Sequence, residues 1–581
     1  MKRVAIGCGV MIVIFVLVLA AAAGAGRYRS AVRAGSWLEL DLHGDYLEYR
    51  PPSILATFLL QGKPLLRDVT DALDKAAKDP KITGVIARVG DLETGWARAG
   101  EIRDHVLAYR KSGKPAICYF ETAGEGGAAN LEYYLASAFE KIYLGPSGDI
   151  GLPGLMGEGL FLRGTLDLVG IYPDMEHIGD YKTAMNLFTE KAFTPAHREM
   201  LVAILESIQN TLVTGIAEGR KMTREEVRAL LDRGLFLGAE ALEARLVDGM
   251  KYRDEVLDSL KKPGEKDLPT VKLDRYLKSV RRPGTTGKKT VGVVYGVGMV
   301  VRGKSEFDPA GSEMTMGSDT VARTLREAAE DKAVNAIVFR VDSPGGSYVA
   351  SDIIWREVVR AREKKPVVVS MGDVAGSGGY FVAMPANEIV AQPGTITASI
   401  GVLGGKLDMH GLYNKLGITK EHVSLTPFAD MYSDYQPFTP EQKAAQWKFL
   451  RRVYDDFSHK AARGRNMKWE DVDKIGRGRV WTGQDAKRLG LVDHLGGMDV
   501  AIARAKDLAK IPAGDEVRLK FFPEEQTVWQ ALRSRDEEEA VVVVAFRGIR
   551  RVAAVLWRLA AAAGTGTEER VLMMPALPEV R

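Results

Sequence analysis

Short apolar runs alternate with amphipathic stretches in the part of the chain that follows residue 35. The alternating strand SWLELDLHG precedes an amphipathic helix near Leu66–Lys78 and a strand, ITGVIARV. A helix over Ala99–Lys111 and a strand, PAICYF, come next. Strands that are separated by helices pair in parallel through right-handed crossovers. The pattern therefore predicts an α/β unit with a mainly parallel sheet flanked by helices.

The same order of elements returns in the second half of the chain. The strands VGVVYGV, NAIVFRV and PVVVSM alternate with helices over Thr320–Glu330 and Ser351–Lys364. His177 and His422 are 245 residues apart, and so are the pairs Thr194-Pro195 and Thr439-Pro440. A repeat of about 250 residues is too long for a solenoid unit, so each copy should be a domain. We predict domains at 36–260 and 290–510, with a Pro/Gly/Lys-rich linker region at 261–289.

The N-terminus carries a continuous apolar run, Val4–Ala23, behind Lys2 and Arg3. About twenty apolar residues suffice to span a bilayer as a helix. We interpret residues 1–26 as an uncleaved transmembrane anchor. A signal peptide cleaved among the small residues Ala21–Ala25 is the alternative. Arginines also follow the run, so charge does not fix the orientation of the anchor.

Composition narrows the functional classes. The chain has 581 residues, of which 46% are hydrophobic and 27% charged, and this suits two or three globular domains. A formal charge of +4 with no basic and aromatic patch gives no sign of nucleic-acid binding. Cys8 and Cys118 are the two cysteines, which excludes a disulfide framework and a cysteine metal site. We expect no cofactor and no metal.

The stretch VVVSMGDVAGSGGY, residues 367–380, reads as a buried strand that enters a glycine-rich turn. Glycines on both sides of Ser377 permit a sharp turn and leave the hydroxyl accessible. A strand–turn–helix serine is a common way to present a nucleophile. The alternative is an ordinary packing turn in which Ser377 only caps the next helix.

The two copies differ in their candidate catalytic residues, and each lacks residues that the other has. Ser377 falls opposite Asn130, and the loop DSPGG (342–346) falls opposite GDLET (90–94), which has no glycine pair. Conversely, Lys182 in GDYKTA falls opposite Pro427. Each copy lacks what the other has, so a composite site is expected.

A serine hydroxyl needs a base to act as a nucleophile. None of the eight histidines has an obvious catalytic context, which leaves a neutral lysine as the other option. The pKa of that lysine must fall by roughly three units, a cost near 4 kcal/mol that burial can supply. Gly345 and Gly346 could direct their N–H groups at a developing oxyanion, with Gly378 as a further donor. Taken alone, DSPGG favours an ordinary turn between a strand and a helix.

The motifs DSPGG, DVAGSGGY, TITASIGV (395–402) and GDYKTA together resemble signal peptide peptidase A (protease IV), in its long tandem-domain bacterial form. The resemblance covers about residues 36–510. It implies two tandem ClpP/crotonase-like domains and a Ser/Lys peptidase. Carried over onto this chain, Ser377 is the nucleophile and Lys182 the general base. Gly345 and Gly346 lie in the oxyanion loop, and Ser399 hydrogen-bonds the lysine.

The resemblance also implies a biological setting. It predicts a single-pass protein of the inner (plasma) membrane, with extracytoplasmic or periplasmic domains that form a homotetramer. Its substrates would be apolar peptides, above all signal peptides left after secretion, and it would need neither ATP nor metal. A crotonase-like acyl-CoA enzyme and a non-catalytic membrane scaffold of the same fold are the alternative functions.

The resemblance does not cover the C-terminal extension, residues 515–581, whose role is open. Its segment VVVVAFRGIRRVAAVLWRLAAAA (540–562) mixes apolar residues with four arginines. It reads either as a helix packed on the domain or as a strand and an amphipathic helix on a membrane surface.

Overall fold

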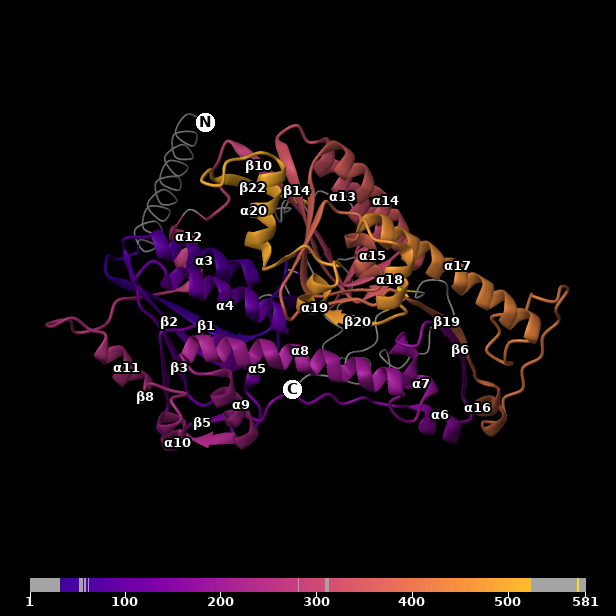
Figure 1. Cartoon of the computed structure of the whole chain (residues 1–581), viewed down its shortest axis with the longest axis horizontal. Helices are drawn as coiled ribbons and strands as arrows, with labels where there is room; N and C mark the ends of the chain where they lie inside the picture. Colours follow the sequence, from indigo (N-terminus) through magenta and orange to yellow (C-terminus); the bar gives the residue numbers. More distant parts are fainter. Residues whose placement is uncertain are drawn as a thin grey trace, which may run out of the picture.

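The structure is a computed structural model. It describes residues 32–523 apart from 52–55, 57–58, 61, 281 and 309–312, and it also describes residues 572–573. The predicted anchor at 1–26 and the segment 540–562 lie outside the described residues. Two α/β units stand side by side, the first in indigo to magenta and the second in pink to orange (Figure 1).

The first unit is built on a six-stranded parallel sheet. Its central strands, β1 to β3, are the predicted ones, and their buried side chains contribute to a large hydrophobic core and to a smaller separate cluster. In sheet order the strands are β8 (Gly249–Met250), β4 (Lys141–Leu144), β3 (Ala116–Phe120), β2 (Ile82–Leu92), β1 (Ser36–Gly44) and β9 (Thr270–Lys272).

The second unit repeats this order strand for strand. Its path β21-β17-β16-β14-β10-β22 is again parallel and has its own core. These strands are β21 (His494–Leu495), β17 (Glu388–Ala391), β16 (Val367–Gly376), β14 (Val334–Ser343), β10 (Lys289–Val297) and β22 (Val517–Phe522). The predicted fold class, two tandem α/β units with mainly parallel sheets, is therefore confirmed.

Helices cover the sheets much as the apolar periodicity predicts. The helix predicted at Leu66–Lys78 has the same bounds in the structure. The other three begin two or three residues earlier than predicted, since their caps lie upstream of the apolar pattern. The helices are α3 (Leu66–Lys78), α4 (Trp96–Arg110), α13 (Ser318–Glu330), α14 (Tyr348–Lys364) and α20 (Met498–Leu508).

Each copy ends with an edge strand that returns to pair with its own first strand. β9 pairs with β1, and β22 pairs with β10; Thr270 and Val517, which begin these strands, are 247 residues apart. The predicted linker region 261–289 thus contains β9 and the helix α12 (Leu273–Ser279), and β22 lies in the predicted C-terminal extension. Strands this short, among Pro, Gly and Lys residues, carry little periodic signal.

Two elements join the units. The long helix α8 (Pro195–Arg220) runs beneath both of them and packs on α5 (Asn130–Ala136) and β20 (Val480–Thr482) (Figure 1). Among the described residues it is the helix long and apolar enough to cross a membrane, but 56% of its apolar window is buried within the protein, as in a core helix. The second element is an antiparallel ribbon of β6 (Tyr172–Ile178) and β19 (Val402–Asp408), one strand from each copy.

The remaining elements are short or peripheral. Those of the first copy are β5 (Asp149–Leu152), α6 (Arg163–Val169), η1 (Thr183–Met185), α7 (Asn186–Thr189), α9 (Arg224–Arg233), β7 (Gly234–Leu237), α10 (Gly238–Glu243) and α11 (Arg253–Ser259). Those that follow are β11 (Met299–Val301), β12 (Phe307–Asp308), β13 (Glu313–Gly317), β15 (Gly345–Gly346), α15 (Gly378–Ala383), β18 (Ile396–Ala398), α16 (His410–Lys415), α17 (Pro440–Gly464), α18 (Trp469–Ile475), α19 (Gly483–Arg488) and β23 (Leu572–Met573).

Candidate active site

Ser377 lies at the junction of β16 and α15. The strand continues through Gly376, where it pairs with β18, and the helix begins at Gly378. Ser377 has φ +52° and ψ −113°, a conformation that costs energy for a residue with a side chain. The backbone N–H of Ser377 donates to the carbonyl of Ala398 at 2.7 Å, which helps to hold this turn. The sequence therefore supplies a strained strand–turn–helix serine, as its glycine pattern predicts.

The β6–β19 ribbon delivers Lys182 to the second unit. After β6 the chain turns at Gly179, whose carbonyl accepts a hydrogen bond from His177 Nδ1 at 2.7 Å. The N–H of Tyr181 then donates to the carbonyl of Arg477 at 3.1 Å, across the boundary between the copies. His177 thus helps to shape the turn that carries the lysine.

The side chains of Lys182 and Ser377 meet inside the protein. Lys182 Nζ lies 2.9 Å from Ser377 Oγ, 3.0 Å from Ser399 Oγ and 3.2 Å from the Ser399 carbonyl oxygen. All three residues are fully buried. Burial without a carboxylate partner lowers the pKa of Lys182 well below its ordinary value of 10.5. An amine in this setting favours the neutral form, which can accept a proton.

The DSPGG loop stands beside the serine. Gly345 and Gly346 have φ +102° and +151°, values that residues with a Cβ rarely adopt, and Gly346 pairs with Val300 of β11. A Cβ on Gly378 would lie 3.1 Å from Gly346 N, so the loop and the start of α15 are in close contact. The Gly345 N–H donates to Ser343 Oγ at 3.2 Å within the loop. Gly346 and Gly378 are thus the better placed of the three predicted donors.

Two glycines that no sequence pattern singles out make room for the lysine. A Cβ on Gly478 would lie 2.4–2.5 Å from the backbone and Cβ of Lys182, and one on Gly401 would lie 3.2 Å from Lys182 Cδ. Gly478 also has φ +83°. Both residues belong to the second copy, so no local pattern connects them with Lys182.

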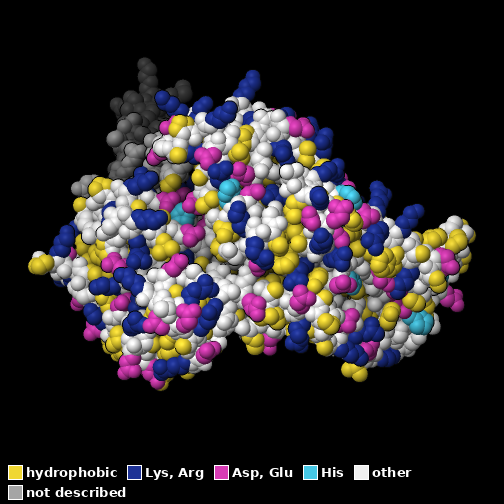
Figure 2. Space-filling model, viewed as in Figure 1, with side chains coloured by type: hydrophobic (Ala, Val, Ile, Leu, Met, Phe, Trp, Pro, Cys, Tyr) yellow, Lys and Arg dark blue, Asp and Glu magenta, His cyan; other side chains and the backbone are white. Residues whose placement is uncertain are grey.

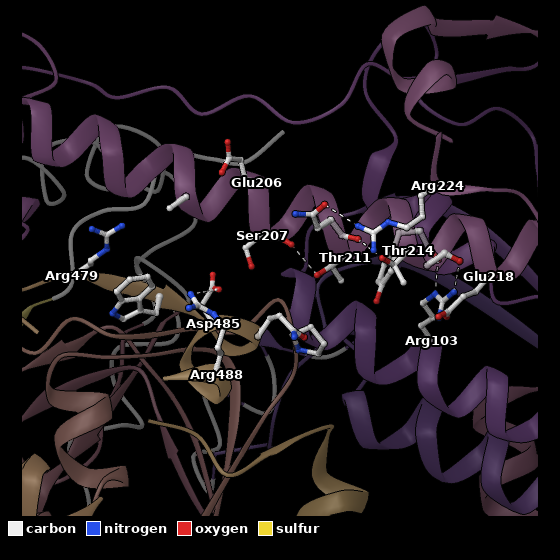
Figure 3. A pocket seen from close by; sticks show the side chains of 17 residues that line it. Arg103, Glu206, Ser207, Thr211, Thr214, Glu218, Arg224, Arg479, Asp485 and Arg488 are labelled. Carbon is white, nitrogen blue, oxygen red and sulfur yellow. Dashed lines mark hydrogen bonds and ion pairs between the residues drawn. The ribbon is translucent and has the colours of Figure 1, made fainter. Parts of the chain in front are cut away.

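A large cavity lies elsewhere. It has a volume of about 830 Å³ between α8 and the β20–α19 region, and polar side chains line it, among them Arg103, Ser207, Arg479 and Asp485 (Figure 3). Neither Ser377 nor Lys182 lines it. Within the described residues, no group of three or more His, Cys, Asp and Glu side chains could hold a metal ion.

A buried amine beside a strained serine is the arrangement of a serine-type hydrolase with a lysine base. The family model for peptidase family S49 matches residues 108–268 and 360–512, one region in each copy. The chain belongs to this family and is a serine-type peptidase.

Several curated relatives match most of the chain. A chloroplastic serine protease SPPA of Arabidopsis thaliana is 35% identical over 498 residues, which are 84% of this chain and 71% of that protein. Protease 4 of Salmonella typhi is 33% identical over 477 residues, or 80% of this chain and 74% of that protein. Among solved structures, ClpP1 of Listeria monocytogenes covers 36% of this chain and 92% of its own, at 15% identity and a TM-score of 0.23. A score this low adds nothing to the fold description.

Proposed function

We propose that this peptidase hydrolyses extended apolar peptides at a membrane, with Ser377 as nucleophile and Lys182 as general base. The observation that carries the proposal is the 2.9 Å separation of Lys182 Nζ and Ser377 Oγ in a fully buried environment. A neutral amine has two N–H donors and one lone pair. Ser399 Oγ and its carbonyl oxygen accept the two N–H groups, which leaves the lone pair for the Ser377 hydroxyl.

The reaction follows from these positions. Lys182 takes the hydroxyl proton as Ser377 Oγ attacks the scissile carbonyl carbon. The N–H groups of Gly346 and Gly378 would hold the oxyanion, and one such donor contributes roughly 3 kcal/mol in other hydrolases. The Lys182 ammonium then returns the proton to the leaving amine. A water molecule releases the acyl group in the second half of the reaction, with Lys182 again as the base.

A backbone edge beside the serine supports an extended substrate. The described C-terminal residues Leu572–Met573 (β23) pair antiparallel with Gly345–Gly346 (β15). This edge can therefore accept an added strand, the mode in which main-chain hydrogen bonds give affinity and side-chain pockets give specificity. Signal peptides remaining after secretion are apolar and fit such a site when extended.

Labelling with a fluorophosphonate tests the dyad directly. We expect stoichiometric modification of Ser377 in the wild type and none in Ser377→Ala or Lys182→Ala. Mixed assemblies of Ser377→Ala with Lys182→Ala should stay inactive, because serine and lysine meet within one chain. Peptidase activity retained by Ser377→Ala would refute the proposal, and activity regained on mixing would move the site to a subunit boundary.

The membrane setting rests on the apolar run Val4–Ala23. We place the chain as a single-pass protein of the plasma membrane with both units on its outer side. The full chain should stay with membranes after carbonate extraction, and a chain without residues 1–26 should be released. Protease protection in spheroplasts would test the orientation.

The assembly we propose is a homotetramer. The arm between α16 and α17, at the right of Figure 1, exposes large apolar side chains, with Val423 and Leu425 more than 90% exposed (Figure 2). The β6–β19 ribbon joins the copies within one chain, but residues 417–423, the counterpart of β6, form no strand. The counterpart of β19, near Met156 and Leu160, also exposes apolar side chains.

Repeating the internal contact between chains would bury both exposed segments, and a head-to-tail contact whose rotation closes after four copies gives a tetrameric ring. The occupant of the arm would thus be a second copy of this chain. We expect Val423→Asp combined with Leu425→Asp to yield monomers by light scattering. A tetramer that survives this change would exclude the arm as the interface.

A further inference from the structure

A cluster of buried charges crosses the boundary between the two units next to the active-site loops. Arg98, in the first turn of α4, contributes the guanidinium from the first unit, and Asp342 and Asp373 contribute carboxylates from the second. The three side chains are 14%, 9% and 15% exposed. Asp45 and Glu48 of the first unit bind the same guanidinium.

Asp342 occupies an irregular point in the sheet just before the oxyanion loop. The pairing of β14 and β16 shifts register between Val341 and Ser343, as at a β-bulge. At this point Asp342 Oδ1 accepts the N–H of Val374 at 2.9 Å, and its Oδ2 binds Arg98. Bulges re-aim the residues that follow them. Here β14 leads directly into Ser343 and the glycine loop, and β16 leads into Ser377.

Asp373 ties the serine strand to the same helix. Its carboxylate accepts the N–H groups of Gly95, Ala97 and Arg98 at 2.9–3.0 Å, so it caps α4 from the other unit. Arg98 Nε lies 3.3 Å from the same carboxylate. Helix α4 therefore fixes both strands that end in the active site.

We propose that Arg98 is a positioning residue for the serine and its oxyanion loop, acting through Asp342 and Asp373. The proposal rests on the Ser377–Lys182 site described above. The first unit then contributes two residues to a site whose nucleophile lies in the second unit. Lys182 is the base, and Arg98 is the cation that positions the two strands.

The charges explain why arginine is required. Two carboxylates on neighbouring strands repel each other, and a buried carboxylate that loses its partner is strongly destabilised. Burial raises the pKa of Asp342 to about 6, and Arg98 opposes this rise. Lysine offers one compact charge in place of a planar group that reaches several carboxylates at once. Without Arg98, the bulge would relax or Asp342 would take up a proton.

A double-mutant cycle tests the proposal. We expect Arg98→Gln to lower kcat about 100-fold with KM within about threefold, because small misalignments near reacting groups cost this much. In an Asp342→Asn background, which keeps the acceptor for Val374 N–H but removes the charge, Arg98→Gln should cost no more than about tenfold. Arg98→Lys should fall between Arg98→Gln and the wild type.

Arg88 provides the matched control. It lies on β2 of the same unit, is 49% exposed and lies 3.6 Å from Glu121, so Arg88→Gln should leave kcat unchanged. The inference is overturned if folded Arg98→Gln keeps kcat within about threefold of the wild type, or if it loses the full 100-fold in the Asp342→Asn background.

If Arg98→Gln does not fold, Arg98→Lys carries the test, and an unchanged kcat there overturns the inference. Fluorophosphonate labelling distinguishes a failure of the role of Arg98 from a failure of the proposed Ser377–Lys182 dyad. A wild type that is not labelled at Ser377 contradicts the site itself. Equal labelling rates in the wild type and a folded Arg98→Gln contradict only the role of Arg98.

Discussion

Two segments that the duplication made equivalent have opposite fates. Residues 177–182 are packed between the copies and end in the fully buried Lys182. Their counterpart, residues 422–427, is exposed throughout and has a proline where the lysine would be. At the ends of the strands β16 and β3, it is the second copy that carries the catalytic candidate and the first copy that lacks it. β16 runs ten residues to Ser377, while β3 stops after five and is followed by a loop.

This comparison shows that the same scaffold can carry either the lysine or the serine with its glycine loop. In this chain each copy carries one of the two. Six strands follow the same order in both sheets, so this shared part does not distinguish the copies, although the second sheet adds β18 and β20 beside the end of β16. What differs are loops and strand ends, where binding and catalytic residues concentrate. Changes at the unequal positions should therefore affect activity far more than changes at their counterparts.

The largest effect is expected from Lys182→Ala. Removal of the base should lower the rate of Ser377 acylation by about 10³-fold or more, since general bases contribute up to about 10⁴-fold. The fold should survive, because burying an amine is costly and its loss relieves that cost. Labelling kinetics and thermal unfolding measure both. Lys420→Ala, on the exposed arm, is the control, and equal losses in the two variants would contradict the comparison.

A glycine pair sharpens the comparison further. Gly478→Ala would place a Cβ 2.4–2.5 Å from Lys182 at φ +83°, so we expect kcat to fall about 100-fold as the lysine shifts. Gly417→Ala has a similar φ of +68° but open space around it. It should cost only about 1 kcal/mol of stability, with unchanged kcat. Equal kcat in both variants would show that Gly478 does not position the base.

The pH dependence should follow Lys182. Activity should fall as pH drops through its lowered pKa, since the protonated amine cannot accept the serine proton. Between that pKa and 10.5 the unfolded state binds the additional proton, so stability rises with pH by about 1.4 kcal/mol per unit and is lost as pH falls. Denaturant titrations of wild type and Lys182→Met measure this slope. A slope unchanged in Lys182→Met would exclude Lys182 as its source.

The smallest effect is expected in the first copy. Asn130, the counterpart of Ser377, bonds both the N–H and the carbonyl of Gly154 through its amide. Asn130→Ser should cost about 1 kcal/mol of stability and create no fluorophosphonate-reactive serine, since this copy has neither base nor glycine loop. Labelling of the double variant Asn130→Ser with Ser377→Ala, at the new hydroxyl, would contradict this expectation.

Much of the fold could be predicted from periodicity, because the central strands and α3 follow their apolar patterns closely. The start of α14 could also be predicted, because the side chain of Ser347 accepts the N–H of Ala350 and so caps the helix locally. The start of α4 at Trp96 could not, because its cap is Asp373 of the other unit. β9 and β22 could not be predicted, because edge strands of three and six residues show little apolar periodicity.

The candidate site shows the same division. Ser377 and the glycine loop stand out locally, and the comparison of copies singles out Lys182. Gly478 and Arg98 act by packing or charge on residues of the other copy, far away in sequence. A single sequence carries no signal for such contacts.

The capping of α4 by Asp373 also bears on how the chain is made. The first unit leaves the ribosome with the end of this helix unsatisfied, and the helix is completed only when β16 has been synthesised and docked. Folding of the two units is thereby coupled, and we expect one calorimetric transition in place of two. A nascent chain therefore carries no paired Lys182 and Ser377 until synthesis has passed residue 377.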